Sequence, residues 1–147
     1  MSSAYLLDVN VLVAAVWPTH VFHDRVQKWF LDHAARFGWA TCPVTQSGFV
    51  RLLSNPAFAP NALSVADALS VLETNLSHPA HQFWPDEIGL AQAVRAFLPG
   101  PKGHKQVSDA YLLGLAIHKK AKFATTDRAI LDLLPEQGAE RQRVVLV

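Results

Sequence analysis

The feature that most restricts the fold of this chain is the alternation of short, mostly apolar segments with segments of helical periodicity. Strands are expected at 5–7, 40–44, 82–84, 122–125 and 143–147. Between them, apolar residues recur at helical spacing, as at Phe22, Val26 and Phe30. This alternation predicts an α/β fold, a three-layer sandwich with a mainly parallel central sheet, because crossover helices cover both faces of such a sheet.

Capping residues and helix breakers set the expected helix bounds. Helices are expected at about 22–37, 46–53, 64–76, 86–98, 107–119 and 127–134, with a loop at 99–103. Ser64, Asp86 and Ser108 are the expected N-caps, because their side-chain oxygens can accept hydrogen bonds from free helix N–H groups. In the third and fourth helices the residues expected to face the core are Val65, Leu69, Leu72 and Leu76, then Leu90, Ala91, Val94, Phe97 and Leu98.

Length and composition agree with one folded unit over residues 1–147. Half of the residues are hydrophobic and 17% are charged, which allows a sizeable core and excludes intrinsic disorder. The single cysteine, Cys42, excludes an internal disulfide framework and a cysteine-rich zinc module. The chain shows neither a signal peptide nor an apolar run of the roughly 20 residues that span a bilayer, so we expect a cytoplasmic protein with no membrane partner.

Aspartates occupy three positions where strands end or helices begin. Asp8 ends the first expected strand, Asp127 follows the fourth, and Asp109 lies in the first turn of the helix between Val107 and Lys119. Ligands of parallel α/β sheets bind at the carboxyl ends of the strands, so the three side chains are expected to meet there. Asp109 and Asp127 also suit an ordinary helix start, where a carboxylate accepts from free N–H groups.

Asp8 is harder to explain by capping alone. It lies between Leu7 and another apolar run, so its carboxylate is placed beside the core, where an unpaired charge is costly. Carboxylates that lie close together also raise one another's pKa. A divalent cation relieves both effects, and Mg²⁺ or Mn²⁺ suits hard oxygen ligands.

Three short motifs follow one another along the chain: Leu7-Asp8-Val9-Asn10-Val11-Leu12-Val13, Ser108-Asp109-Ala110-Tyr111-Leu112-Leu113 and Thr125-Thr126-Asp127-Arg128. They resemble the motifs of PIN-domain ribonucleases, in the same order and over essentially the whole chain. Within that family the chain is most similar to VapC toxins of toxin–antitoxin pairs, which the segments 17–20 and 48–56 also resemble. The resemblance implies a Mg²⁺- or Mn²⁺-dependent endoribonuclease that cuts structured RNA such as tRNA with a metal-activated water. It also implies a homodimer and a cognate VapB-type antitoxin whose C-terminal segment covers the acidic groove.

The resemblance also implies roles for individual residues. Asp8, Asp109 and Asp127 would hold the metal, directly or through water. Asn10 would orient Asp8 or a bound water, because its amide both donates and accepts hydrogen bonds. Thr125 or Thr126 would support the last motif through a hydroxyl hydrogen bond.

One position departs from the family pattern, which has a glutamate at the start of the helix after the second strand. Here Gln46 occupies that place. A glutamine carbonyl can contact a metal or a coordinated water, but it carries no charge and cannot act as a base. We therefore expect weaker metal affinity and one firmly held ion. The alternative is that Gln46 has no metal role.

Basic residues and histidines are weaker candidates. From Lys102 to Arg128 six basic residues outnumber two aspartates, an excess expected to surround the acidic site or else to form an ordinary solvated surface. The candidate RNA contacts are His104, Lys105, Arg128 and Arg51, and Arg51 could instead pair with a carboxylate in the groove. The pairs His20/His23 and His78/His81 lack the further ligands of a zinc site, so surface or capping roles are expected.

Two other functions are compatible with the same residues. An aspartate after a first apolar strand also occurs in haloacid-dehalogenase-like phosphotransferases, but those enzymes have a second aspartate two residues later, where this chain has Asn10. A PIN-like module that binds RNA or a partner with little or no cutting is the other alternative. The uncharged Gln46 favours that second alternative.

Overall fold

The structure, a computed structural model, describes residues 4–58, 61–98, 100 and 103–147. At its centre is a sheet of five parallel strands in the order β3-β2-β1-β4-β5. The strands are β1 (Tyr5–Leu7), β2 (Trp39–Thr41), β3 (His81–Phe83), β4 (Lys122–Thr125) and β5 (Val144–Leu146). The predicted parallel α/β sandwich is confirmed.

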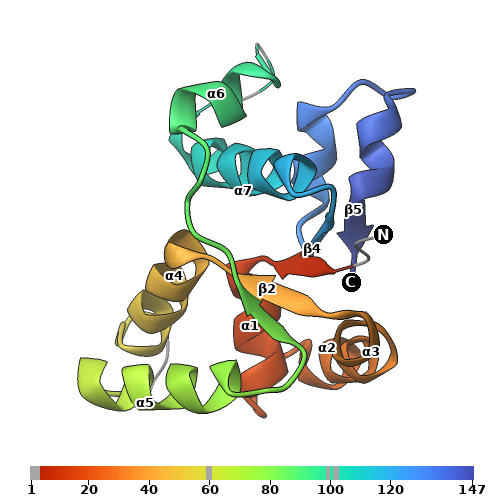
Figure 1. The fold of residues 1–147 in the computed structure, drawn as a ribbon. Helices are drawn as coiled ribbons and strands as arrows, with labels where there is room; N and C mark the ends of the chain where they lie inside the picture. Colours follow the sequence, from red (N-terminus) through yellow and green to blue (C-terminus); the bar gives the residue numbers. More distant parts are fainter. Residues whose placement is uncertain (1–3, 59–60, 99, 101–102) are drawn as a thin grey trace.

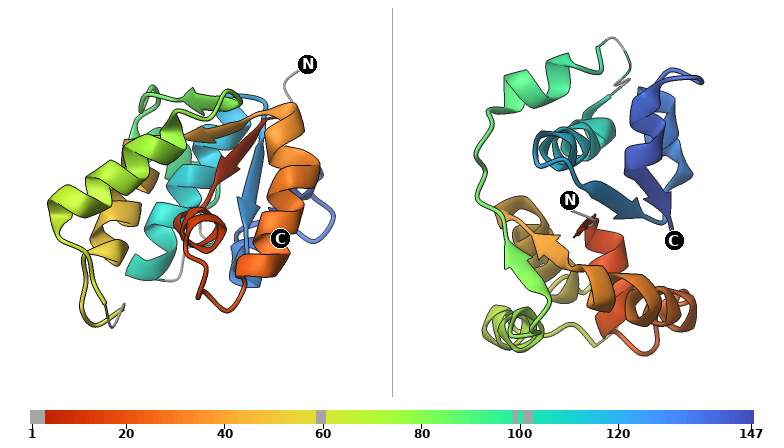
Figure 2. Two further views of the ribbon diagram at one scale, coloured as in Figure 1. Left: turned by 90° about the horizontal axis from the view of Figure 1, so that it is seen from below. Right: turned by 45° about the vertical axis from the view of Figure 1, so that its right-hand side comes forward.

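Helices cover both faces of this sheet (Figures 1 and 2). One face carries α1 (Val9–Val16), α2 (His23–Trp29), a π-helical turn (Phe30–Ala34), α3 (Ala35–Phe37), α4 (Pro43–Leu53) and α5 (Val65–Leu76). The other carries α6 (Leu90–Arg95), a 3₁₀ turn (His104–Gln106), α7 (Val107–His118) and the 3₁₀ segments η3 (Arg128–Leu133) and η4 (Ala139–Arg143). None of the helices in the described ranges is long and apolar enough to cross a membrane.

Two hydrophobic cores lie on the two faces of the sheet. Successive strand residues point to opposite faces, so Leu6 and Phe123 join the core beneath α7, whereas Leu7 and Trp39 join the core beneath α1 and α4. The three central strands β2, β1 and β4 are therefore buried on both faces, as their mainly apolar sequences require, whereas the edge strand β3 is largely exposed.

Some predicted bounds are wrong by a few residues. The second strand ends at Thr41 instead of residue 44, because Pro43 begins α4 three residues earlier than expected. Proline suits the first position of a helix, where its missing N–H has no partner to lose. β3 lies one residue earlier than predicted, and the last predicted helix is the 3₁₀ segment η3. Pro99, Pro101 and Lys102 of the predicted loop lie outside the described residues.

The inward faces of two helices are also shifted from the prediction. In α5, Val65 and Leu69 are exposed, and the face that packs on the core centres on Ala68 and Leu72. In the α6 region, Leu90 and Leu98 are exposed, whereas Ala93 and Phe97 are buried. Alanine permits close helix packing, so buried alanines define the inward faces that the larger residues were expected to define.

The predicted caps divide into one that is confirmed and two that are wrong. The Ser64 hydroxyl accepts from the Asp67 N–H at 3.0 Å. Asp86 does not cap α6, whose N-cap is Gly89, and instead accepts from the Tyr111 hydroxyl at 2.6 Å. Ser108 lies inside the first turn of α7, because a 3₁₀ turn precedes that helix.

Candidate active site

Asp8 lies at the carboxyl end of the central strand β1 and is fixed by two hydrogen bonds. Its Oδ1 accepts from the backbone N–H of Val9 at 2.8 Å, so Asp8 is the N-cap of α1. Its Oδ2 accepts from the Thr125 hydroxyl at 2.7 Å. The side chain is buried, and burial raises its pKa, while the bonds from Thr125 and Val9 act against that rise and the charge of Asp127 adds to it.

Thr125 connects the two neighbouring strands. It ends β4, which pairs in parallel with β1, so the carboxyl ends of these strands lie side by side. Besides donating to Asp8, its Oγ1 accepts from the backbone N–H of Asp127 at 3.1 Å. One buried hydroxyl therefore fixes the positions of two candidate metal ligands.

Asp127 has the capping role that its sequence position allowed. Its Oδ1 accepts from the Ala129 N–H at 2.9 Å and so caps η3. The residue is exposed, which leaves the rest of its carboxylate accessible to solvent. A cap of this kind fixes the side chain without removing it from the site, since each carboxylate oxygen has two acceptor positions.

Asp109 approaches the same edge of the sheet from α7. Its pKa is raised to about 7, first by burial and then by the negative charges of Asp8 and Asp127. The structure therefore brings the three predicted aspartates into one electrostatically coupled group, which we call the acidic cluster (Asp8, Asp109 and Asp127). Near neutral pH the metal-free cluster retains a proton that three independent carboxyl groups would have lost.

The acidic cluster fits a divalent cation by its chemistry. Within the described ranges none of its members forms an ion pair, and the pair that is formed there joins Lys119 to Glu87 at 2.8 Å. The mutual repulsion is thus uncompensated, and carboxylate oxygens are the ligands that Mg²⁺ and Mn²⁺ prefer. Yet in the described part of the chain no three His, Cys, Asp or Glu side chains are placed so that they could hold one ion as they stand. Side-chain adjustment or bridging water must complete any metal site.

Gln46 lies in the first turn of α4, as predicted, and is held by a chain of side-chain hydrogen bonds. Its Nε2 donates to Thr41 Oγ1 at 3.0 Å, and Thr41 Oγ1 is 2.8 Å from His81 Nε2. Thr41 is buried and is the last residue of β2; the register, which pairs Leu6 with Ala40 and Leu7 with Ala124, places it one residue before the level of Asp8 and Thr125. Sequence reasoning missed Thr41 and His81, although the position of Thr41 at a strand end was available as a signal.

Two predicted supporting residues make no such bonds. Asn10 is exposed, and in the described structure no hydrogen bond joins it to Asp8. Of the two threonines considered for the last motif, Thr125 makes the supporting bonds, and Thr126 is half-buried without a side-chain hydrogen bond among the described residues.

The predicted basic surround is wrong for half of its members. Lys119, Lys120 and Lys122 follow α7 at the opposite edge of the sheet, where Lys122 pairs with Tyr5 at the start of β1. They are separated from Asp109 by the length of that helix. These three lysines are close to the aspartates in the sequence but not in space.

The remaining basic candidates are placed in three ways. Arg128 is exposed beside Asp127, and His104 is exposed in the turn before α7. The Lys105 side chain lies outside the described part of the structure. Arg51 is exposed on α4 and forms no ion pair with a described carboxylate, so the predicted pairing in the groove is wrong.

The histidine pairs have the structural roles that were expected. The Nδ1 atoms of His20 and His78 accept from the backbone N–H groups of Phe22 and Ala80, each at 3.0 Å. His23 Nδ1 lies 2.7 Å from the Ala14 carbonyl. Hydrogen bonds to the backbone therefore fix the positions of His20, His23 and His78.

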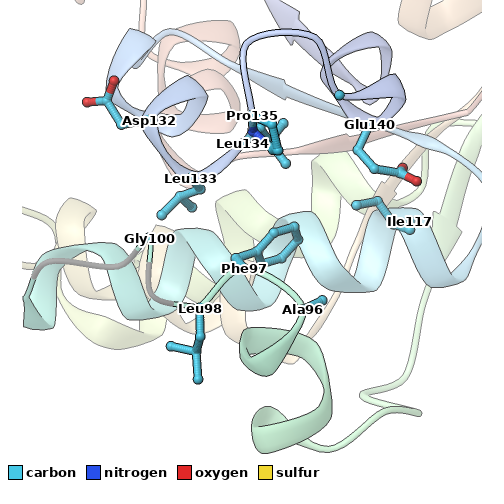
Figure 3. A pocket seen from close by; sticks show the side chains of 11 residues that line it. Ala96, Phe97, Leu98, Gly100, Ile117, Asp132, Leu133, Leu134, Pro135 and Glu140 are labelled. Atoms are coloured by element: carbon cyan, nitrogen blue, oxygen red, sulfur yellow. The ribbon is translucent and has the colours of Figure 1, made fainter.

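A hollow of about 730 Å³, whose lining includes no member of the acidic cluster, lies between the segment that follows α6 and the end of α7 on one side and the segment 132–140 on the other (Figure 3). Its lining is mainly apolar, with Phe97, Leu133 and Pro135, and two acidic residues, Asp132 and Glu140, border it. It contains none of the predicted site residues. Its acidic border makes it unsuited to a polyanion.

Comparison with known proteins identifies the relatives of the chain. The PIN domain family profile matches residues 5–133. Ribonuclease VapC38 of Mycobacterium tuberculosis is 40% identical over 132 residues, which cover 90% of this chain and 91% of that protein. Ribonuclease VapC44 of the same species is 39% identical over 142 residues, covering 95% and 96% of the two chains.

Solved structures share the fold at lower identity. VapBC2 from Rickettsia felis, bound to a DNA fragment from their promoter, superposes with a TM-score of 0.61 at 14% identity and covers 84% of this chain and 88% of that one. FitAcB from Neisseria gonorrhoeae has a TM-score of 0.57 at 20% identity, with 88% and 92% covered. At such identities the likeness supports the α/β fold described above.

Proposed function

The chain belongs to the PIN-domain family and, within it, to the VapC ribonucleases, and on this premise we propose that it is a metal-dependent endoribonuclease and the toxin of a toxin–antitoxin pair. Membership of this family argues against the alternative of a haloacid-dehalogenase-like phosphotransferase. The relatives are named as ribonucleases, which supports hydrolysis of RNA phosphodiester bonds by this chain.

The observation that carries the proposal is the acidic cluster itself. Its carboxylates follow β1 and β4 and begin α7; burial, and then the charges of Asp8 and Asp127, raise the pKa of Asp109 to about 7, and no described cation forms an ion pair with them. Such coupling destabilises the metal-free protein and is typical of functional sites. A structural ion-pair network would instead supply a lysine or arginine partner.

The proposed roles follow from the contacts. Asp8, Asp109 and Asp127 would hold a Mg²⁺ or Mn²⁺ ion, directly or through water, while Thr125 fixes Asp8 and the backbone of Asp127. When bound, such an ion stabilises charge on the phosphate and lowers the pKa of water. Gln46 would contribute to this site through its carbonyl oxygen, because its amide nitrogen already donates a hydrogen bond to Thr41.

We propose structured RNA such as tRNA as the substrate, with the cytoplasm as the place of action. A cognate VapB-type antitoxin and a homodimer are the proposed partners, on the support of family membership. Co-expression with the product of the neighbouring small reading frame, followed by affinity capture, tests the antitoxin. Size-exclusion chromatography with light scattering tests the dimer.

The nuclease proposal is tested by incubating purified protein with total tRNA in Mg²⁺, in Mn²⁺ or in EDTA, beside the Asp8→Asn variant. We expect fragments in Mg²⁺ or Mn²⁺, and none in EDTA or with the variant. Cutting that survives both EDTA and the substitution would refute it.

A second candidate is a PIN-like module that binds RNA or a partner with little cutting, and Gln46 is the observation that favours it. The chain has three carboxylates at the site where the family pattern has four. Retained tRNA binding without fragments in the same assay would select this second function.

A further inference from the structure

A second hollow, of about 510 Å³, is lined by residues of α1, of α4 and of the segment that follows α4. The two helices lie side by side (Figure 1). Val9, which lines it, directly follows Asp8 in the chain. Its lining residues are Val9, Gly48, Arg51, Leu52, Ser54, Asn55 and Pro56. A volume of this order accommodates a group of nucleotide size.

The lining is chemically suited to an anion with an apolar body. It contains no aspartate or glutamate, and the guanidinium of Arg51 has no ion-pair partner in the described structure. Leu52 and Pro56 supply apolar surface. This lining contrasts with the hollow of Figure 3, which is bordered by Asp132 and Glu140.

Hydrogen bonds within the lining leave particular groups free for a ligand. Asn55 Oδ1 accepts from the Ala57 N–H at 2.9 Å, and among the described residues the amide NH₂ of Asn55 has no acceptor and can donate to a ligand. The Ser54 hydroxyl donates to the Val50 carbonyl at 2.7 Å, so its oxygen remains an acceptor. The hollow thus offers a cation, a donor and an acceptor on one wall.

The wall also packs tightly on α1 at Val9, the residue after Asp8. Gly48 packs so closely on α1 that a Cβ there would lie 2.6 Å from Val9 Cγ2. This contact holds α4 against the start of α1 and fixes the position of Arg51 relative to Asp8. The hollow therefore exists before any ligand binds.

We propose that this hollow binds one nucleotide of the RNA substrate beside the cleaved bond, with the Arg51 guanidinium on its phosphate and Leu52 and Pro56 against its sugar and base. The inference rests on the proposed ribonuclease function and adds a substrate subsite to it. RNA is favoured over an acidic peptide because the relatives of this chain are ribonucleases and because Val9, which lines the hollow, directly follows Asp8.

The test measures binding and cleavage separately for Arg51→Gln, with Arg36→Gln as the matched control. Arg36 lies on α3, at the amino edge of the sheet and away from the acidic cluster. Binding of a short fluorescent single-stranded RNA of mixed sequence is measured in the Asp8→Asn background, in Mg²⁺, so that the RNA is not cut. Cleavage of total tRNA is measured with Asp8 intact.

We expect Arg51→Gln to weaken RNA binding about tenfold, as the loss of a charged hydrogen bond implies. The slope of log affinity against log salt should fall by about 0.7, the value for one phosphate contact on a single strand. Arg51→Lys should restore the slope and only part of the affinity, because lysine cannot bind phosphate in a bidentate manner. Arg36→Gln should change neither quantity.

Equal RNA affinity for Arg51→Gln and Arg36→Gln, while the wild type cleaves tRNA, would overturn the subsite and leave the ribonuclease intact. The same holds if Arg51→Gln weakens only the capture of the antitoxin, because the hollow would then bind a peptide. If the wild type neither binds nor cleaves RNA, the proposed function fails and the subsite fails with it.

Discussion

Thr125→Val removes the buried hydroxyl that fixes the positions of Asp8 and Asp127 in the acidic cluster. The hydroxyl donates to Asp8 at 2.7 Å and accepts from the Asp127 N–H at 3.1 Å. Thr125 is only 1% exposed, so water cannot replace either bond without rearrangement. Valine has nearly the same shape, and the substitution therefore tests the hydrogen bonds more than the packing.

The expected cost follows from the partners. A hydrogen bond to a charged group contributes roughly 1.5–3 kcal/mol, and we expect a loss of about 2 kcal/mol in the free energy of unfolding. For a chain of this size that corresponds to a Tm lower by roughly 4–8 °C. The pKa of Asp8 should also rise further, because the bond from Thr125 lowers it in the native protein.

The assay is urea denaturation of the metal-free protein near pH 7.5, with Thr126→Val as the control. Thr126 makes no side-chain hydrogen bond in the described structure, and we expect its substitution to change stability by less than about 0.5 kcal/mol. In an Asp8→Asn background the cost of Thr125→Val should differ from its cost in the wild type, since the two residues are coupled. Equal stability of the two valine variants would refute the role assigned to Thr125.

Three further predictions concern pH, metal and packing. The pKa of Asp109 is about 7 in the folded protein and 3.8 for an unperturbed aspartate, so between these pH values the folded protein binds more protons than the unfolded chain. The stability of the metal-free protein should therefore fall as the pH rises from about 4 to about 7. Asp109→Asn should flatten this slope in urea titrations at several pH values, and an unchanged slope would contradict the raised pKa of Asp109. Calorimetry should find one tight Mn²⁺ per chain and tighter binding for Gln46→Glu, whereas two tight ions in the wild type would disprove the inference drawn from this glutamine. Gly48→Ala should destabilise the protein by roughly 1–3 kcal/mol through its contact with Val9, measured by thermal unfolding, and wild-type stability would mean that α1 and α4 can separate freely.

The acidic cluster was predictable because it depends on topology more than on detail. Asp8 and Asp127 follow strands that pair in parallel, so their meeting required only the correct sheet. Asp109 required one more step, that the helix before β4 begins at the same edge. These relations hold for any α/β sheet with right-handed crossovers.

Other features depend on contacts that linear spacing does not encode. Lys119 is close to Asp109 in sequence, but α7 spans 12 residues and a helix rises about 1.5 Å per residue, which places the two near opposite edges of the sheet. The hydrogen bond from Gln46 to Thr41 links α4 to the preceding strand, and it depends on the rotamers of both side chains, which the sequence does not specify. The inward face of α5 was misplaced because Ala68, a small residue, marks its contact with the core.

The most direct test of the acidic cluster compares the initial rates of tRNA cleavage in Mn²⁺ for Asp8→Asn, Asp109→Asn and Asp127→Asn, alone and in pairs. Residues that act as one catalytic unit give losses that do not add. We therefore predict that each single variant loses nearly all activity and that each pair is no worse than the singles. A single variant that cleaves at the wild-type rate, with its fold intact by circular dichroism, would contradict the proposal that these three carboxylates form the active site.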